Sequence, residues 1–347
     1  MELDERFMRA ALREAEKALG LTSPNPAVGA VIVRGDRVVG RGFHHRAGLP
    51  HAEIEALRSL RSPALARGAA IYVTLEPCST HGRTPPCVDA IIAAGLARVV
   101  IGAIDPNPRH AGRAVELLKA AGVGVRIGVL ERECTRLNAP FNKWITTGLP
   151  WVIAKAGMTL DGRLTRPPGE GQWITSEESR ADAQCLRARV DAILIGANTL
   201  RADNPRLTIR GEAARSEKPQ PWRVVLTRGH EPLPKTAHLF TDEHRERTLV
   251  FSGKSLRSVL RELAKKQQVT SVLIEGGMRV LGDAFDRRLV DEVCFYVAPM
   301  ASGGPVTAIG GRGVGATLEA PVVEDPRYTQ IGGDLRLSGL VRYTAST

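Results

Sequence analysis

The sequence predicts an α/β protein with two domains. Short apolar runs of the kind that form buried strands alternate along the chain with segments of helical periodicity. The 347 residues are enough for two cores, and 43% hydrophobic and 24% charged residues are ordinary for a globular protein. A polar, proline-bearing stretch at 146–150 separates two such series. We therefore expect domains at residues 1–147 and 148–347.

The first half predicts a helix, a hairpin and then alternating helices and strands. Asp4 is a candidate N-cap for a helix that Gly20 ends, and a rigid polar loop follows at 23–26. The other expected elements are strands at 27–33 and 37–43, a helix at 51–60, a strand at 70–75, a helix from 87 to 95, a strand at 98–103, a helix at 110–121 and a strand at 125–129. This order predicts a mixed sheet with helices on its faces.

One imidazole and two thiols in the first half form a candidate metal site. His51 opens an expected helix, Cys78 follows a strand, and Cys87 opens the next helix. Nitrogen and thiolate sulfur are ligands that Zn²⁺ prefers, and three of them leave a fourth position open, as in catalytic zinc sites. A helix N-terminus also stabilises a thiolate. We expect one Zn²⁺ per chain at these residues.

Glu53 stands two residues after the expected histidine ligand, where its carboxylate can exchange protons with a water at the open position. His-x-Glu followed by Pro-Cys is typical of zinc-dependent nucleobase deaminases, although eight residues separate the two cysteines here instead of two. We expect Glu53 to carry protons while water replaces an amino group on a ring carbon. Polar residues of flanking loops would shape the pocket: Asn25, His44, Arg83, Asp105 and Asn107.

Charge and cysteine content narrow the classes of partner. The net charge of +11 is spread over both halves, and only 4% of residues are aromatic, whereas nucleic-acid surfaces cluster charge and stack bases on aromatic rings. The spread charge fits anionic small molecules, and it also fits solubility alone. Five cysteines favour a reducing interior, with Cys134, Cys185 and Cys294 as small core residues. We expect a cytoplasmic protein with no nucleic-acid or membrane partner.

The second half begins with a strand at 151–154 and lacks both a G-x-G-x-x-G fingerprint and a P-loop. Instead, expected strands at 191–195, 223–227 and 271–274 each lead into a glycine-bearing loop, the last one before a helix at 279–288. Backbone N–H groups in such loops can bind an anion at a helix N-terminus. The three loops together predict a ligand cleft outside the carboxyl ends of the strands.

Four stretches of the first half, at 24–29, 51–53, 74–78 and 82–87, resemble the deaminase half of the bifunctional riboflavin-biosynthesis proteins. The resemblance implies a cytidine-deaminase-like α/β/α domain that deaminates 2,5-diamino-6-ribosylamino-4(3H)-pyrimidinone 5′-phosphate. It implies zinc ligands, a proton carrier and substrate contacts at the residues named above. Thr80 departs from the family, in which many members carry histidine.

The second half resembles the reductase half of the same family through residues 155–162, 172–176, 203–208 and 275–277. The resemblance implies a dihydrofolate-reductase-like α/β domain that uses NADPH to reduce the ribosyl group to ribityl. Implied cofactor contacts are Gly157, Trp173, Thr199, Asp203, Gly277, Met278, Arg279, Val280, Leu281, Gly282 and Asp283. Implied substrate contacts are Lys155, Gly171, Arg187, Leu207, Arg210 and Glu275, with the arginines as phosphate partners. Gly171 and Arg228 stand where serine is expected.

The residues leave two other functions open. An RNA-editing deaminase with a basic nucleic-acid-binding second domain shares the zinc chemistry but would not consume NADPH. A structural zinc module needs a fourth protein ligand, for which His81 is the candidate. We expect the bifunctional enzyme, acting on phosphorylated pyrimidines as a homo-oligomer.

Overall fold

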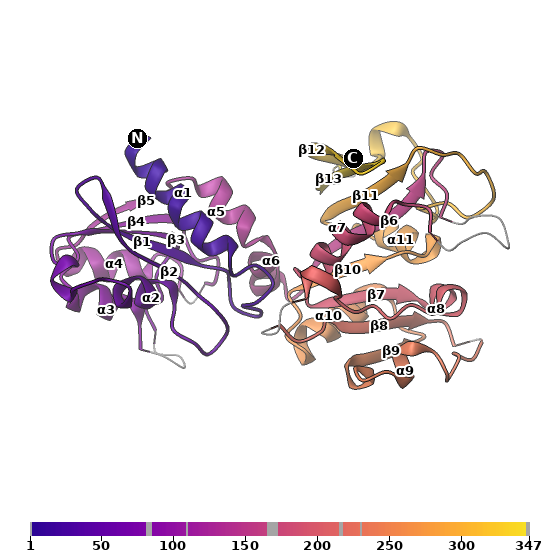
Figure 1. Ribbon diagram of the computed structural model, residues 1–347, viewed down its shortest axis with the longest axis horizontal. Coiled ribbons are helices and arrows are strands. Elements are labelled where there is room, and N and C mark those ends of the chain that lie inside the picture. The colour runs from indigo at the N-terminus through magenta and orange to yellow at the C-terminus, as the bar shows by residue number, and fades with distance from the viewer. Residues whose placement is uncertain are drawn as a thin grey trace. The chain divides into compact units, whose positions relative to one another are not determined.

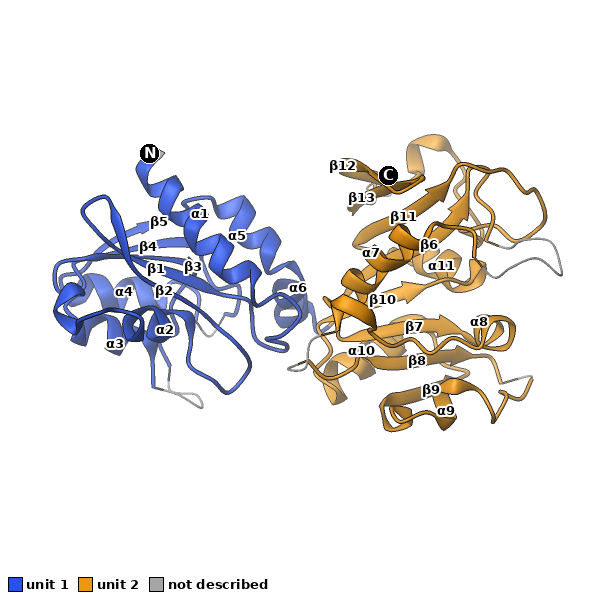
Figure 2. Cartoon of the chain, in the orientation of Figure 1, with its two compact units in different colours: residues 1–148 blue, residues 149–347 orange. Residues whose placement is uncertain are grey.

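Two β-sheets organise the chain, one in each of its two units, residues 1–148 and 149–347 (Figure 2). The computed structural model describes residues 2–80, 85–108, 110–164, 173–214, 218–229 and 231–344. Within these ranges, no helix has both the length and the apolar character to cross a membrane.

The sheet of the first unit has five strands in the order β2-β1-β3-β4-β5. Its strands are β1 (Gly29–Arg34), β2 (Arg37–Phe43), β3 (Ala70–Leu75), β4 (Arg98–Ala103) and β5 (Gly124–Ile127). β1 is antiparallel to both β2 and β3, whereas β3, β4 and β5 run parallel. The expected hairpin and mixed sheet are therefore confirmed.

Helices cover both faces of this sheet (Figure 1). On one face lie α1 (Glu2–Glu16) and α5 (Glu131–Leu137), and on the other lie α2 (Ala52–Arg58), α3 (Cys87–Ala93) and α4 (Arg113–Ala120). The helix α6 (Ala139–Thr147) ends the unit at Gly148, which has a left-handed backbone. The α/β/α architecture implied for this half is confirmed.

Asp4 is a buried ion partner and not a helix cap. The cap prediction is wrong because α1 already begins at Glu2, so Asp4 lies inside the helix. Its carboxylate accepts a hydrogen bond from Tyr72 at 2.6 Å and pairs with Arg98 at 2.8 Å and with Arg126. These partners belong to β3, β4 and β5, so one carboxylate fastens α1 to three strands.

The sheet of the second unit has eight strands in the order β12-β13-β11-β6-β10-β7-β8-β9. The strands from β11 to β9 in this order run parallel, whereas β12 and β13 are antiparallel. The bounds are β6 (Trp151–Thr159), β7 (Ala192–Gly196), β8 (Trp222–Thr227), β9 (Thr248–Ser252), β10 (Ser271–Glu275), β11 (Glu292–Ala298), β12 (Val322–Ile331) and β13 (Asp334–Arg342).

Helices cover both faces of this sheet as well. α10 (Leu256–Lys266) and α11 (Met278–Asp286) pack on one face, and α7 (Glu177–Arg187), α8 (Ala197–Asp203) and α9 (His238–Thr241) pack on the other. β10, β7 and β8 are neighbours, so the three glycine-bearing loops do meet at one sheet edge.

Two of the three cysteines expected in the core are there. Cys134 and Cys294 are buried, but Cys185 is exposed on α7, so its assignment to the core is wrong.

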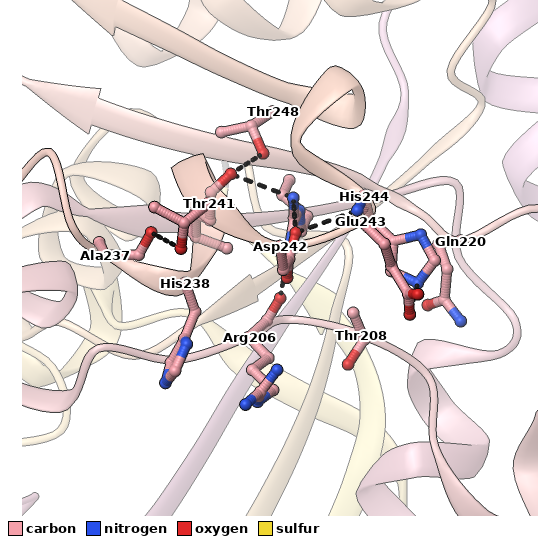
Figure 3. A network of polar contacts seen from close by, with 12 residues as sticks. Arg206, Thr208, Gln220, Ala237, His238, Thr241, Asp242, Glu243, His244 and Thr248 are labelled. Atoms are coloured by element: carbon pink, nitrogen blue, oxygen red, sulfur yellow. Dashed lines mark hydrogen bonds and ion pairs between the residues drawn. The ribbon is translucent and has the colours of Figure 1, made fainter.

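A fully buried arginine near the amino end of β8 ties together the loops that carry Arg206 and Asp242, two of the residues labelled in Figure 3. Arg223 on β8 donates to both carboxylate oxygens of Asp242, at 2.6 and 2.8 Å, and to the carbonyl oxygens of Arg206 and Leu239. A buried guanidinium is costly unless it is paired in this way. The pair thus fixes the segment that precedes Leu207 against the end of α9.

Candidate functional sites

Three ligand atoms converge where β3 ends and the helices α2 and α3 begin. His51 Nδ1 lies 3.4 Å from Cys78 Sγ and 3.3 Å from Cys87 Sγ. Two atoms bound to one tetrahedral zinc at ~2.0 and ~2.3 Å would lie about 3.5 Å apart, so the donor set and its spacing fit Zn²⁺. Among the described residues, His51, Cys78 and Cys87 are the group of metal-ligating side chains that the structure brings within reach of one ion. His81, the candidate fourth ligand, lies outside the described residues.

The local fold prepares the two sulfurs for a cation. Cys78 follows β3, and Cys87 is the first residue of α3, whose backbone N–H donates to Cys78 Sγ at 3.2 Å. The hydrogen bond between the sulfurs lowers the pKa of Cys78 and raises that of Cys87, because they share one proton. A bound divalent cation would favour the thiolate at both positions.

Glu53 lies in the first turn of α2, two residues after the ligand His51, which precedes the helix. Its side chain is buried, and burial raises the pKa of Glu53 to about 7. A carboxyl with this pKa can both accept and return a proton near neutral pH.

Asn25 and His44 form a polar wall beside the ligand His51. The His44 ring lies edge-on to the His51 ring, with centroids 5.2 Å apart. His44 Nδ1 faces the carbonyl oxygen of Pro50 at 3.0 Å, so Nδ1 carries the proton and Nε2 accepts from Asn25 Nδ2 at 3.1 Å. Burial lowers the pKa of His44, which keeps this ring neutral.

Glu76 organises the loop that carries Asp105 and Asn107, and sequence reasoning gave it no role. Its buried carboxylate accepts from the backbone N–H groups of Asp105, Gly112 and Ala114, at 3.3, 2.9 and 3.0 Å. Asp105 in turn accepts from the N–H of Asn107 at 2.8 Å. One signal was present, since a carboxylate directly after a buried strand must find donors.

Asn138 holds the loop that carries Asn25, and it too was missed. Its amide oxygen accepts from the N–H of Ala27 at 2.8 Å, and its amide nitrogen donates to the carbonyl of Ala27 at 2.9 Å.

Thr80, the departure from the family, lies 3.5 Å from His110 Nδ1 through its hydroxyl oxygen. Arg83 lies outside the described residues.

In the second unit, Lys155 and Glu275 lie on neighbouring strands, and Arg187, the last residue of α7, is paired with Glu275. Lys155 on β6 is directly paired with Glu275 on β10. Arg187 donates to both oxygens of Glu275, at 2.6 and 2.8 Å, and to the carbonyl of Thr208 at 3.0 Å. Burial alone would raise the pKa of Glu275, but the charges of Arg187 and Lys155 outweigh it and hold the pKa at about 2.

Arg210 borders a cleft of about 570 Å³ near the segments that lead into β8 and β9, and the cleft is also lined by Arg206, Thr208, Gln220, Asp242, Glu243 and His244. Burial lowers the pKa of Arg210, and the charges of Arg187 and Arg206 lower it further. Two arginines thus face the cleft together with Asp242, which is paired with Arg223, and Glu243, and these arginines are candidate partners for a phosphate group. Leu207 between these arginines is buried and has a left-handed backbone, with φ 51°. Arg206 was not among the expected residues.

The expected cofactor segment begins at a tight turn before α11. Gly277 has φ 85°, and a Cβ there would lie 3.2 Å from Thr199 Oγ1, so only glycine fits. Val280 and Leu281 point into the core, Gly282 packs on the backbone of Gly310, and Asp283 pairs with Arg287. For this segment the available binding groups are therefore those of the backbone turn and of Met278 and Arg279.

Trp173 is 53% exposed, with the guanidinium of Arg180 5.1 Å from its ring centre. A Cβ on Gly157 would lie 3.2 Å from the Thr175 side chain, so the segment after Trp173 packs directly over β6. Burial raises the pKa of Asp203, at the end of α8. Arg228 follows β8 and is exposed, and Gly171 lies outside the described residues.

Family comparisons agree with this division. Residues 1–103 match the family described as the cytidine and deoxycytidylate deaminase zinc-binding region. Residues 150–337 match the family described as the RibD C-terminal domain.

Relatives match along almost the whole chain. The riboflavin biosynthesis protein RibD of Escherichia coli is 40% identical over 96% of this chain and 98% of its own length, and that of Aquifex aeolicus is 38% identical over 96% and 97%. The structure of Acinetobacter baumannii RibD has a TM-score of 0.89 at 37% identity, covering 98% of this chain and 99% of that one. A Thermotoga maritima diaminohydroxyphosphoribosylaminopyrimidine deaminase/5-amino-6-(5-phosphoribosylamino)uracil reductase has a TM-score of 0.87 at 34% identity, covering 99% of each.

Proposed function

The chain belongs to the RibD family, the zinc- and NADPH-dependent deaminase–reductases of riboflavin biosynthesis, and on that premise we propose which residues carry each activity. Residues 1–147 form the pyrimidine deaminase and residues 148–347 form the reductase. The observation that carries the first assignment is the convergence of His51, Cys78 and Cys87 beside the buried Glu53.

In the deaminase, His51, Cys78 and Cys87 hold the metal. When bound, Zn²⁺ supplies a Lewis acid that lowers the pKa of the attacking water. Glu53 carries both protons of that water in turn: it passes the first to the ring nitrogen and the second, taken from the hydroxyl that the water has become, to the amino group that departs as ammonia. Asn25 and the neutral His44 orient the pyrimidine, and Asp105 and Asn107, on the loop fixed by Glu76, contact its other groups. Arg83 is the further substrate contact that the family resemblance implies. The substrate is the diaminopyrimidinone ribosylamine 5′-phosphate.

In the reductase, NADPH would supply the hydride when bound along Gly157, Trp173, Thr199, Asp203 and residues 277–283, which it would meet through the backbone turn at Gly277 and through Met278 and Arg279. Lys155 donates a hydrogen bond to the carbonyl oxygen of the open-chain ribose, which stabilises the negative charge that develops there. Arg210 binds the phosphate. Arg187 has three of its N–H donors engaged by protein oxygens, so its larger task is to hold Glu275 ionised.

A phosphorylated pyrimidine is thus the substrate of both sites, and the RNA-editing alternative is not favoured, because a reductase domain stands where that alternative needs a nucleic-acid-binding domain. We also propose that the chain acts in the cytoplasm as a homo-oligomer, without nucleic acid. The free thiols of the zinc site favour a reducing compartment such as the cytoplasm.

One assay tests the proposal. Purified protein is mixed with the diaminopyrimidinone ribosylamine phosphate and NADPH, while ammonia and the absorbance of NADPH are followed together. We expect one ammonia and one oxidised NADPH per substrate, with ammonia first. Ammonia release without NADPH oxidation would contradict the reductase assignment, and activity without zinc would contradict the deaminase assignment.

A further inference from the structure

The strand register places an aromatic ring beside Lys155. On β11, Cys294 is paired with Lys155 and Tyr296 with Gly157. Side chains two residues apart on a strand share a face, so Tyr296 lies on the same face as Lys155. The Lys155 Nζ lies 5.8 Å from the centre of the Tyr296 ring. This is within the range of a cation–π contact.

The ring itself is held rigidly. Tyr296 is 1% exposed, and its hydroxyl donates to Asp182 Oδ2 at 2.6 Å. Arg336 on β13 donates to both oxygens of Asp182, at 2.8 and 2.9 Å. Burial raises the pKa of Tyr296, so the phenol remains the donor in this contact. The ring therefore has one orientation relative to the sheet.

One helix fixes both neighbours of Lys155. Asp182 and Arg187 both lie on α7, where Asp182 holds Tyr296 and Arg187 holds Glu275. The ammonium of Lys155 thus has a fixed carboxylate on one adjacent strand and a fixed aromatic face on the other. A flexible four-carbon side chain loses most of its freedom in such a setting.

We propose that Tyr296 is a positioning residue for the reductase: its ring face holds the Lys155 ammonium where it meets the substrate carbonyl. The inference rests on the role proposed for Lys155, and it adds a residue that no part of the expected site contained. The effect arises from the negative electrostatic face of the ring and not from its hydroxyl or its volume.

Fluorination separates these contributions, because fluorine weakens the negative face of the ring and changes its shape little. We compare Tyr296→Phe with Tyr296→pentafluorophenylalanine, measuring NADPH oxidation with the deaminated substrate. The kcat should fall by a factor between about two and thirty from the first variant to the second, the range of a cation–π contact. The KM for NADPH should change little, since the ring positions Lys155 and not the cofactor.

The same pair of replacements at Tyr328, which is 65% exposed on β12, is the matched control and should show no such step. Ammonia release, measured on every variant, reports whether the first unit is intact. If the pentafluoro protein folds poorly, rings with one, two and three fluorines replace it. The kcat should then fall steadily as fluorines are added. Equal kcat across the Tyr296 series overturns the inference. Absence of NADPH oxidation by the unaltered protein would instead refute the reductase assignment itself.

Discussion

The two candidate sites differ in how their charges are balanced. In the first unit, the imidazole of His51 lies 3.3–3.4 Å from two sulfurs that share one proton, and a bound cation is needed to balance two thiolates there. In the second unit, Glu275 already has Arg187 at 2.6 Å and Lys155 beside it. The first site is therefore completed by its metal, whereas the second is built by ion pairs within the protein, and its fold depends on them.

The largest expected effect follows from changing the proton carrier of the first site. Glu53→Gln should lower ammonia release by about 10²- to 10⁴-fold, because an amide cannot transfer the protons. Zinc content, measured on the purified variant, should stay near one per chain. Glu55→Gln, two residues further along α2, is the control. A Glu53→Gln protein that keeps most of its deaminase rate would refute the assignment.

Lys155→Met tests the second site in the same way. The variant keeps the length of the side chain but loses its donors, so we expect NADPH oxidation to fall by about 10²- to 10³-fold, the loss seen when one oxyanion donor is removed. Ammonia release should be unchanged. Lys265→Met, exposed on α10, serves as the control. Loss of both activities in Lys155→Met would mean that the two units do not work separately.

Stability should reveal the ion pairs of the second unit. Arg187→Met leaves a buried carboxylate with a weaker partner, at a cost of about 3 kcal/mol in the free energy of unfolding of that unit. Urea unfolding, followed by hydrogen exchange in peptides from each unit, locates the loss. Arg189→Met, exposed two residues later, should have little effect. If both variants unfold at the same urea concentration, the pair contributes nothing to the second unit.

A smaller, pH-dependent effect is expected at the first sheet. Burial would raise the pKa of Asp4, but its bonds to Arg98 and Tyr72 lower it overall. The stabilisation is therefore fully present above the unfolded pKa of ~3.9 and is lost as the pH falls below it. Asp4→Asn should cost about 1 kcal/mol at pH 7, because both arginine partners reach solvent.

Thermal unfolding of the first unit between pH 7 and pH 3 measures this effect, with Asp36→Asn in the exposed hairpin turn as the control. The difference between Asp4→Asn and the unaltered protein should shrink as the pH falls. A difference that is independent of pH would show that the carboxylate charge is not what holds α1 to the sheet.

Local signals explain what the sequence could predict. The ligands and Glu53 lie at strand and helix ends that short apolar runs mark clearly, and the parallel strands β7, β8 and β10 are marked in the same way. The start of α1 was misplaced because Asp4 favours caps in general, while its buried partners lie on distant strands. β12 was missed because its side chains are mostly exposed and carry no apolar alternation.

Unlike Glu76, the supporting residues Asn138 and Tyr296 could not be predicted, because their contacts join distant parts of the chain. Asn138 holds Ala27 across 111 positions, and Tyr296 meets Asp182 across 114. A single polar side chain has no period, so no pattern in the sequence indicates such a pair. These contacts appear only when the fold brings together the loops, the helix and the strand that carry these residues.

The most direct test of two separate sites in one chain is a mixture of Glu53→Gln and Lys155→Met proteins. Given the diaminopyrimidinone ribosylamine phosphate and NADPH, Glu53→Gln alone should release little ammonia and oxidise little NADPH, and Lys155→Met alone should release ammonia only. Together they should release ammonia and then oxidise an equal amount of NADPH. If the mixture oxidises no more NADPH than either variant alone, the two reactions do not occur at the separate sites described above.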